Sequence, residues 1–240
     1  MSIERVGEFS LGWGESLVWD DRAQRLYFVD CAARTLHWLD GGRGRLHTLE
    51  LASMPAGIVP TEDGRLVAAL DDGLQVVDTD ASTTTLLTSY PAGLGGRAND
   101  ACADLSGNLI TGTLNLEPAE GSLWWYEYDA EHGRVGPRRV FGDVSDLAGL
   151  PDGATVDTEG GLWCELIGGS QLARFTTDGL DRTLALPLAN PADVAFGGTE
   201  LDRLFVVSVR TGDGGGLDGA LLAVDGLGAR GRPEPRFRLP

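Results

Sequence analysis

Residues 15–30, ESLVWDDRAQRLYFVD, decide the fold, because they contain two short apolar runs separated by a turn rich in aspartate. Apolar runs bounded by Gly, Asp and Pro are typical of paired β-strands. Helical periodicity is almost absent from the chain, so we expect an all-β protein. The same pattern returns in AGIVPTEDGRLVAAL (56–70), NDACADLSGNLITGTL (99–114), DGATVDTEGGLWCEL (152–166) and ADVAFGGTELDRLFVVS (192–208).

The five copies recur at a regular interval. Their turns begin at equivalent residues spaced 41, 43, 53 and 40 positions apart, namely Asp20, Thr61, Asp104, Asp157 and Gly197. Repeats of about 40–50 residues with several strands each are typical of a β-propeller. We therefore expect one β-propeller domain over residues 1–240 with five blades. The alternative is a six-bladed propeller with one degenerate blade in residues 115–145.

Other segments are expected to complete these blades. RVGEFS (5–10) precedes the first copy and is predicted to close the ring as the outer strand of the last blade. Third strands are predicted at TLHWLD, GLQVVD, SLWWYEYD, QLARFTTD and ALLAVDG, and outer fourth strands at LHTLEL, TTLLTSY and RRVFGD.

Charge and composition exclude several kinds of partner and chemistry. A net charge of −17 disfavours nucleic acid and anionic membranes and favours a bound cation. Cys31, Cys102 and Cys164 are widely spaced and odd in number, so we expect free thiols. All 19 basic residues are arginine, which excludes a lysine Schiff base. With neither a signal sequence nor a membrane span, we expect a cytoplasmic monomer that binds a small-molecule substrate.

A ring of polar side chains is predicted at one end of the central channel. In a propeller, the residue five positions before each turn begins the innermost strand, and these residues are Glu15, Ala56, Asn99, Asp152 and Ala192. Two carboxylates and an amide are oxygen ligands that suit Ca²⁺, Mg²⁺ or Mn²⁺. The alternative is that they bond to turn backbone or hydrate the channel mouth.

The segments LGWGESLVWDDRAQRLYFVD (11–30), RANDACADLSGNLITGT (97–113), LPDGATVDTEGGLW (150–163) and AFGGTELDRLFVVS (195–208) resemble the SMP-30/gluconolactonase/regucalcin family. The resemblance covers nearly the whole chain in the same order. It implies a six-bladed propeller with a divalent cation at its axis and, in many members, a lactone hydrolase or related esterase. Ca²⁺ is the expected ion, with Zn²⁺, Mn²⁺ and Mg²⁺ as alternatives.

The resemblance also assigns roles to residues. It implies that Glu15, Asn99 and Asp152 bind the metal, with Asp152 as the catalytic general base and Asn99 also in reach of the substrate. It further implies that Arg97 and Glu117 bind substrate hydroxyls. Trp13 lies two residues before Glu15, so we expect it either to line the pocket or to join the core.

One part of the family pattern is missing. Between GTLNLEPAEGSLW (112–124) and the segment that follows it, the family has a further set of strands with an NGL motif whose asparagine is a metal ligand. About one blade and one ligand are therefore expected to be lost. Water, a backbone carbonyl or Asp146 would fill the gap, or the metal would be weakly bound or absent.

Two functions follow from these observations. The first is a metal-dependent hydrolase of a lactone or similar ester, in which Asp152 deprotonates or orients water. The second is a non-hydrolytic propeller that binds a small molecule, or a remodelled isomerase or cyclase of a specialised pathway that has lost its metal. A propeller used only for protein contacts would carry a charged or aromatic patch, and the sequence indicates none.

Overall fold

The structure is a computed structural model that describes residues 1–90, 97–114, 122–125, 128–129, 132, 134–137, 139–212 and 216–240. The described residues form 22 strands and no helix, which confirms the all-β prediction. Consequently none of them belongs to a helix long and apolar enough to cross a membrane.

Four sheets have four strands each. Three of them follow the chain order from the innermost to the outermost strand, as the repeat predicted. They are β2 (Gly14–Asp20), β3 (Arg25–Asp30), β4 (Thr35–Asp40) and β5 (Leu46–Glu50); β6 (Pro55–Pro60), β7 (Leu66–Leu70), β8 (Gly73–Asp78) and β9 (Thr83–Thr88); and β16 (Leu150–Val156), β17 (Leu162–Ile167), β18 (Gln171–Thr176) and β19 (Gly179–Ala185).

The fourth sheet joins the first strand of the chain to its last three. It consists of β20 (Pro191–Gly197), β21 (Arg203–Ser208), β22 (Leu222–Asp225) and β1 (Ser2–Arg5). Because β1 pairs antiparallel with β22, the predicted closure by an N-terminal outer strand is confirmed. The strand begins earlier than expected, so most of the segment RVGEFS lies after it.

The chain between β9 and β16 forms only two-stranded sheets among the described residues. These pairs are β10 (Arg97–Ala103) with β11 (Leu109–Leu114), β12 (Ser122–Trp125) with β15 (Arg139–Asp143), and β13 (Tyr128–Asp129) with β14 (Arg134–Val135).

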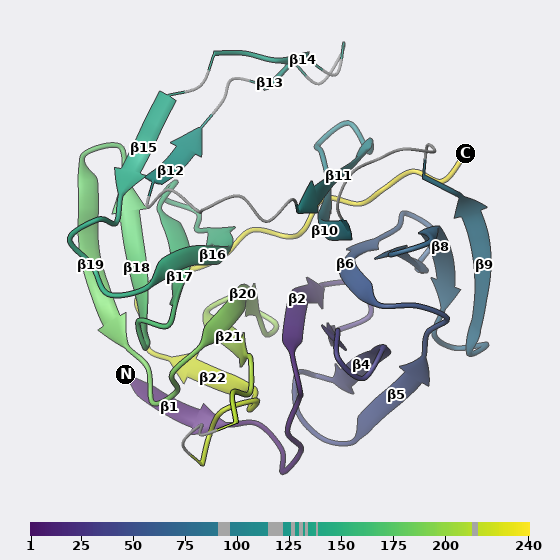
Figure 1. Cartoon of the computed structure of the whole chain (residues 1–240), viewed down its shortest axis with the longest axis horizontal. Coiled ribbons are helices and arrows are strands. Elements are labelled where there is room, and N and C mark those ends of the chain that lie inside the picture. Colours follow the sequence, from purple (N-terminus) through teal and green to yellow (C-terminus); the bar gives the residue numbers. More distant parts are fainter. Residues whose placement is uncertain are drawn as a thin grey trace.

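The sheets follow one another around a central axis (Figure 1). The strands nearest this axis are β10, β6, β2, β20 and β16, and each contacts the next in that order. The ring is therefore a β-propeller whose innermost strands are those that the five sequence copies predicted.

Apolar side chains pack between neighbouring sheets. Trp19 of β2 stacks on Phe205 of β21, with ring centroids 6.2 Å apart. Trp163 of β17 meets Phe196 of β20 edge to face at 6.3 Å. All four rings are buried, and each pair joins one sheet to its neighbour. Stability in this fold comes from these contacts between sheets as well as from hydrogen bonds within them.

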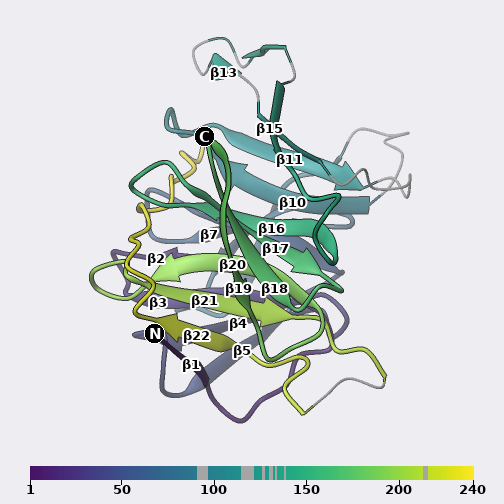
Figure 2. The same ribbon diagram turned by 90° about the vertical axis from the view of Figure 1, so that its left-hand side faces the viewer.

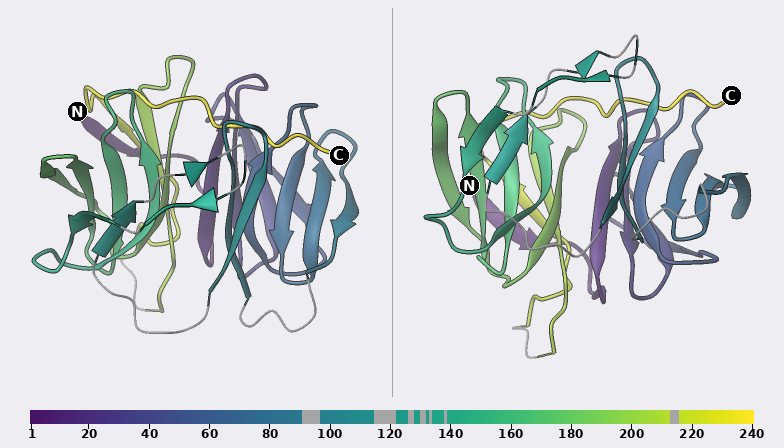
Figure 3. Two further views of the ribbon diagram at one scale, coloured as in Figure 1. Left: turned by 90° about the horizontal axis from the view of Figure 1, so that it is seen from above. Right: turned by 45° about the horizontal axis from the view of Figure 1, so that its top comes forward.

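Residues 226–240 form a segment that we call the C-terminal strap, which crosses one face of the ring (Figures 2 and 3). It contacts the hairpin that connects the first two strands of every repeat. The backbone hydrogen bonds are from Thr158 N to Arg230 O at 2.7 Å, Gly231 N to Leu201 O at 2.8 Å, Phe237 N to Pro60 O at 2.9 Å and Arg238 N to Gly107 O at 3.0 Å.

A buried ion pair fastens the strap to the remaining hairpin. Arg236 donates to Asp20 at 2.6 Å, and both side chains are almost fully buried. Burial alone would raise the pKa of Asp20, but hydrogen bonds from Arg236 and from the N–H groups of Ala23 and Arg22 lower it overall. The strap therefore ties all five inner hairpins together on the face opposite the predicted polar ring.

Candidate functional site

A β-bulge lies at, or directly after, every position of the predicted polar ring. The pairing between inner strand and second strand shifts next to Glu15, at Ala56, at Asn99, at Asp152 and at Ala192. A bulge inserts an unpaired residue, bends the strand and redirects side chains, and bulges are common beside active sites. The five repeats therefore share a local distortion at the same end of the ring.

Glu15 is fixed by the residue two positions before it. The indole N–H of Trp13 donates to Glu15 Oε1 at 2.9 Å, and the backbone N–H of Trp13 donates to Asp30 Oδ1 at 3.1 Å. Trp13 is partly buried and packs against the core between the first two sheets. Of the two expected positions, the structure therefore places Trp13 against the core, and its indole also orients the carboxylate of Glu15.

Asp152 and Asn99 lie on the other side of the ring, in β16 and β10, and both are exposed. Burial raises the pKa of Glu15, and the charge of Asp152 raises it further. Arg97 is the first residue of β10, and its backbone pairs with Leu114. Glu117 lies outside the described residues. Asp146 is exposed in the turn after β15.

Asp193 is a site residue that the sequence reasoning missed. Its Oδ2 accepts a hydrogen bond from Leu17 N at 2.6 Å, and its Oδ1 accepts one from Val194 N at 2.7 Å. A Cβ at Gly153 would lie 2.2 Å from Asp193 Oδ1, so only glycine fits between Asp152 and this carboxylate. Asp193 is therefore held between the strands that carry Glu15 and Asp152.

Glu165 is a second acidic residue that was missed. It lies in β17 opposite the bulge that contains Asp152, with its neighbours Cys164 and Leu166 paired to Ala154 and Pro151. The side chain is fully buried, and neither carboxylate oxygen has a hydrogen-bond partner.

These carboxylates raise one another's pKa. Burial is the largest cause for Glu15, Asp193 and Glu165, and the pKa of each is further raised by the charge of Asp152. Glu234 belongs to the strap, and burial, followed by the charge of Asp100, raises its pKa to about 7. The channel therefore collects negative charge that a proton or a cation would neutralise.

The donor set fits a hard divalent cation. Carboxylate and amide oxygens are the ligands that Ca²⁺ and Mg²⁺ prefer, and crowded carboxylates gain most from a bound cation. Among the residues that the structure describes, no group of three His, Cys, Asp or Glu side chains is arranged to hold a metal ion. Glu15 and Asp152 would therefore need other oxygen donors, and Asn99 can supply one.

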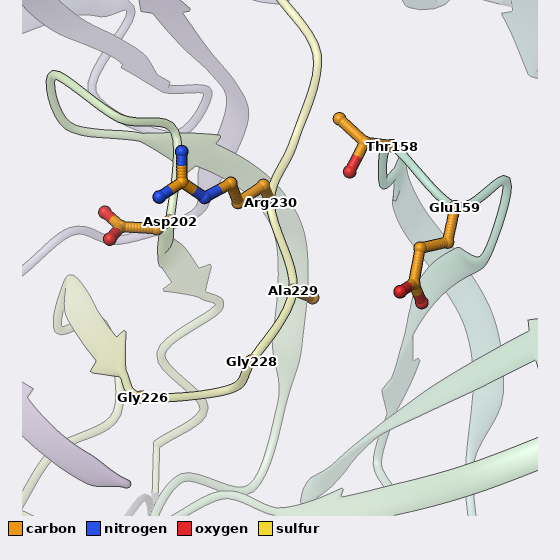
Figure 4. Close-up of a pocket in the computed structure, with 7 residues that line it drawn as sticks. All are labelled: Thr158, Glu159, Asp202, Gly226, Gly228, Ala229 and Arg230. Atoms are coloured by element: carbon orange, nitrogen blue, oxygen red, sulfur yellow. The ribbon is translucent and has the colours of Figure 1, made fainter.

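A cavity of about 430 Å³ lies elsewhere, beneath the strap (Figure 4). It contains none of the predicted site residues. Its lining comes from the turn after β16, the loop before β21 and the strap, namely Thr158, Glu159, Asp202, Gly226, Gly228, Ala229 and Arg230. This cavity is a space between the strap and the hairpins and is not part of the candidate site.

Comparison with known proteins decides the family. A model of the SMP-30/gluconolactonase/LRE-like region matches residues 13–123 and 117–210. The chain belongs to this family. The predicted family resemblance is thereby confirmed.

Two of the relatives are named as lactonases. The chain is 30% identical to pentonolactonase XacC of Haloferax volcanii, over 98% of each protein, and 28% identical to 6-deoxy-6-sulfogluconolactonase of Pseudomonas putida, over 82% and 83%. Its structure superimposes on regucalcin of Agrobacterium tumefaciens, described as a calcium-binding protein, with a TM-score of 0.87, 25% identity and coverage of 98% and 97%. These similarities support a lactonase-like function.

The comparison also bears on the missing blade. The alignment with the pentonolactonase runs over 290 positions, whereas the chain has 240 residues, so at least 50 positions have no counterpart here. That number is close to the 40–53 residues between successive copies. The deficit is consistent with the short two-stranded sheets between β9 and β16.

Proposed function

We propose that this protein is a divalent-cation-dependent hydrolase of a lactone or related ester. The observation that carries the proposal is the pair of carboxylates, Glu15 and Asp152, at matching β-bulges of a propeller whose relatives include lactonases. In this proposal Glu15, Asp152 and Asn99 hold the cation. Arg97, Asn99, Glu117 and Trp13 contact the substrate.

Asp152 is proposed to act as the general base. It takes a proton from water as the water oxygen forms a bond to the carbonyl carbon, and it returns that proton to the ring oxygen when the ring C–O bond breaks. The product is a hydroxy acid, and one water is consumed. Asp152 is exposed, so water can reach it without a change of fold.

Glu15 has a different role because a neighbouring side chain holds its carboxylate in place. Its hydrogen bond from Trp13 holds the carboxylate in one orientation, and its partial burial keeps solvent from competing for it. A bound cation would polarise the carbonyl and stabilise the negative charge that develops on its oxygen.

The test is hydrolysis of a panel of aldonolactones by chelator-stripped protein, with and without Ca²⁺, Mn²⁺, Mg²⁺ or Zn²⁺, followed by acid release. We expect cation-dependent turnover that Asp152→Asn lowers about 10²–10⁴-fold. Asp202→Asn, an exposed aspartate under the strap, is the matched control and should retain full activity. Wild-type turnover by Asp152→Asn would overturn the assignment of the base.

A non-hydrolytic small-molecule-binding propeller is the second candidate. It is favoured by the absence of a three-member metal-binding cluster among the described residues. If the wild-type protein binds aldonolactones by calorimetry but turns over none of them with any of the four cations, this function replaces the first.

A further inference from the structure

The inner strand β20 lies between the two candidate carboxylates in the ring (Figure 1). It contacts β2, which carries Glu15, on one side and β16, which carries Asp152, on the other. At the position of the polar ring β20 itself has only Ala192. The separation of Glu15 and Asp152 therefore depends on how β20 is joined to its two neighbours.

Side chains one residue after the ring position link neighbouring inner strands at two places. Ser16 Oγ of β2 accepts a hydrogen bond from Ile58 N of β6 at 2.8 Å. Asp193 Oδ2 of β20 accepts one from Leu17 N of β2 at 2.6 Å. The two acceptors are equivalent in the repeat, and both donors lie two residues after the ring position of their own strand. The two bonds are therefore the same link between strands, repeated around the ring.

Asp193 also meets the strand on the other side of β20. A Cβ at Gly153 would lie 2.5 Å from Asp193 Cα and 2.6 Å from Ala192 O, so β16 and β20 are in close contact at this point. Val194 N is the group that a polar side chain at Gly153 would bind in the repeated pattern. Asp193 Oδ1 accepts from this N–H group instead, at 2.7 Å. One carboxylate is thus hydrogen-bonded to β2 and to its own strand, at the point where β16 packs against β20.

These contacts lie next to the candidate cation ligands. Leu17 follows Glu15 by two residues in β2, and it is buried. Gly153 directly follows Asp152 in β16. Loss of the acceptor would leave the N–H group of Leu17 buried without a partner, so the bond to Asp193 resists movement of β2 away from β20. Tight binding of a ligand requires that the groups around it are held in place by their neighbours.

We infer that Asp193 is a positioning residue, which sets the separation of Glu15 and Asp152 and thereby the affinity of the proposed site for its cation. The inference rests on the proposed function, in which Glu15 and Asp152 are cation ligands. Asp193 acts through its hydrogen bond to β2 and its contact with β16, and not as a ligand. In the part of the chain that the structure describes, no three carboxylates are arranged to hold a metal ion, which agrees with this role.

The experiment measures Ca²⁺ affinity by calorimetry on chelator-stripped full-length protein, and the urea midpoint of each variant is recorded beside it. Asp193→Ala removes the link between β20 and β2, so we expect the affinity to fall about 10–100-fold. Asp193→Asn is the second variant. It keeps the size of the side chain, but its single oxygen replaces two acceptors, so it should also bind Ca²⁺ more weakly than the wild type.

Two further variants distinguish positioning from other roles. Asp193→Ser should recover most of the affinity that Asp193→Ala loses, because a serine hydroxyl at this repeat position can accept the N–H of the next strand, as Ser16 does. Ser16→Ala is the matched control, since it removes the equivalent link between β2 and β6. The ring position of β6 is Ala56, which is no ligand, so Ser16→Ala should lower the urea midpoint and keep the wild-type affinity.

The outcomes separate this inference from the proposed function. Equal Ca²⁺ affinity of Asp193→Ala and the wild type overturns the inference and leaves the proposed function intact. Equally weak binding by Asp193→Ala and Asp193→Ser also overturns it, because the carboxylate would then act through its charge. A loss of affinity in Ser16→Ala as large as that in Asp193→Ala overturns it as well, since the effect would be a general loosening of the ring. A wild type that binds no cation overturns both proposals.

Discussion

The innermost strands on the two sides of the ring differ in how well they are covered. β2, β6 and β20 are buried along almost their whole length. β16 alternates instead between exposed and partly covered residues, and Leu150 and Val156 are 45% and 43% exposed. The inner strands come from the same repeat, so the difference arises from their neighbours. The described residues between β9 and β16 form two-stranded sheets, which cover β16 less than a four-stranded sheet would.

The same asymmetry divides the candidate site. Glu15 lies on the covered side and is held by Trp13, whereas Asn99 and Asp152 lie on the open side and are exposed. For the proposed hydrolase, the covered side suits the cation and the open side suits the entry of substrate and water. The following predictions test this division, beginning with the largest effect.

Breaking the strap should have the largest effect. Arg236→Met leaves Asp20 buried without its ion pair, so we expect a loss of about 3–5 kcal/mol in the free energy of unfolding. Arg238→Met removes only an exposed pair with Glu62 and should leave the urea midpoint nearly unchanged. Equal midpoints for the two variants would show that the strap does not hold the hairpins.

The next test compares one residue type on the two sides. Ile58 of β6 is 1% exposed, and Ile110 of β11 is 41% exposed. We expect Ile58→Ala to cost about 2–5 kcal/mol in urea unfolding and Ile110→Ala to cost less than about 1 kcal/mol. A similar cost at both sites would mean that the open side is covered in solution.

Stability should also depend on pH when no metal is bound. Glu15, Asp193 and Glu165 have raised pKa values because of burial and mutual repulsion, so the folded state holds protons that the unfolded state releases above about pH 4. Stability therefore falls as pH rises through this window. We expect the Tm of chelator-stripped protein to drop by a few degrees from pH 5 to pH 8.

Two other groups also titrate differently in the folded state, and only the first of them acts between pH 5 and pH 8. Burial lowers the pKa of His37, which makes the folded state less stable below about pH 6.5 and opposes the trend in part. The pKa of Asp157 is lowered because hydrogen bonds led by Arg174 outweigh its burial, so its contribution is lost only in stronger acid. Saturating Ca²⁺ should flatten the dependence, and a metal-free Tm that rises with pH would contradict the prediction.

The smallest effect concerns the cysteines, which are free as the sequence indicated. Cys31, in the turn after β3, and Cys164 of β17 are buried, whereas Cys102 of β10 is exposed. We expect a thiol reagent to label one cysteine per native chain and three after unfolding. Burial of the thiol, and then the charge of Asp100, raises the pKa of Cys102. Its labelling at pH 8 should therefore be slower than that of free cysteine. Rapid labelling of all three would mean that the native protein opens enough to expose Cys31 and Cys164.

The repeat could be predicted from sequence because apolar alternation and Asp/Gly turns are local signals. Counting back from each turn found Glu15, Asn99 and Asp152, and bulges occur at the last two and directly after Glu15. Asp193 was missed because counting back from the turn at Gly197 leads to Ala192, one residue before it. Glu165 was missed although it is a lone charge in the apolar run LWCELI, the same anomaly that identified Glu15. The strap has no strand pattern, so its contacts depend on the assembled ring and could not be predicted.

The strap also affects the order of folding. It follows in the chain every hairpin that it fastens, and β1 must wait for β22, which is made much later. Each four-stranded sheet within one repeat can form as soon as its own residues leave the ribosome, because its pairings are local. Ring closure depends on contacts between distant residues, so we expect it to be the last and slowest step. A chain interrupted before residue 226 keeps β1 and β22 but lacks every strap contact, so we expect its inner hairpins to be more exposed to proteolysis.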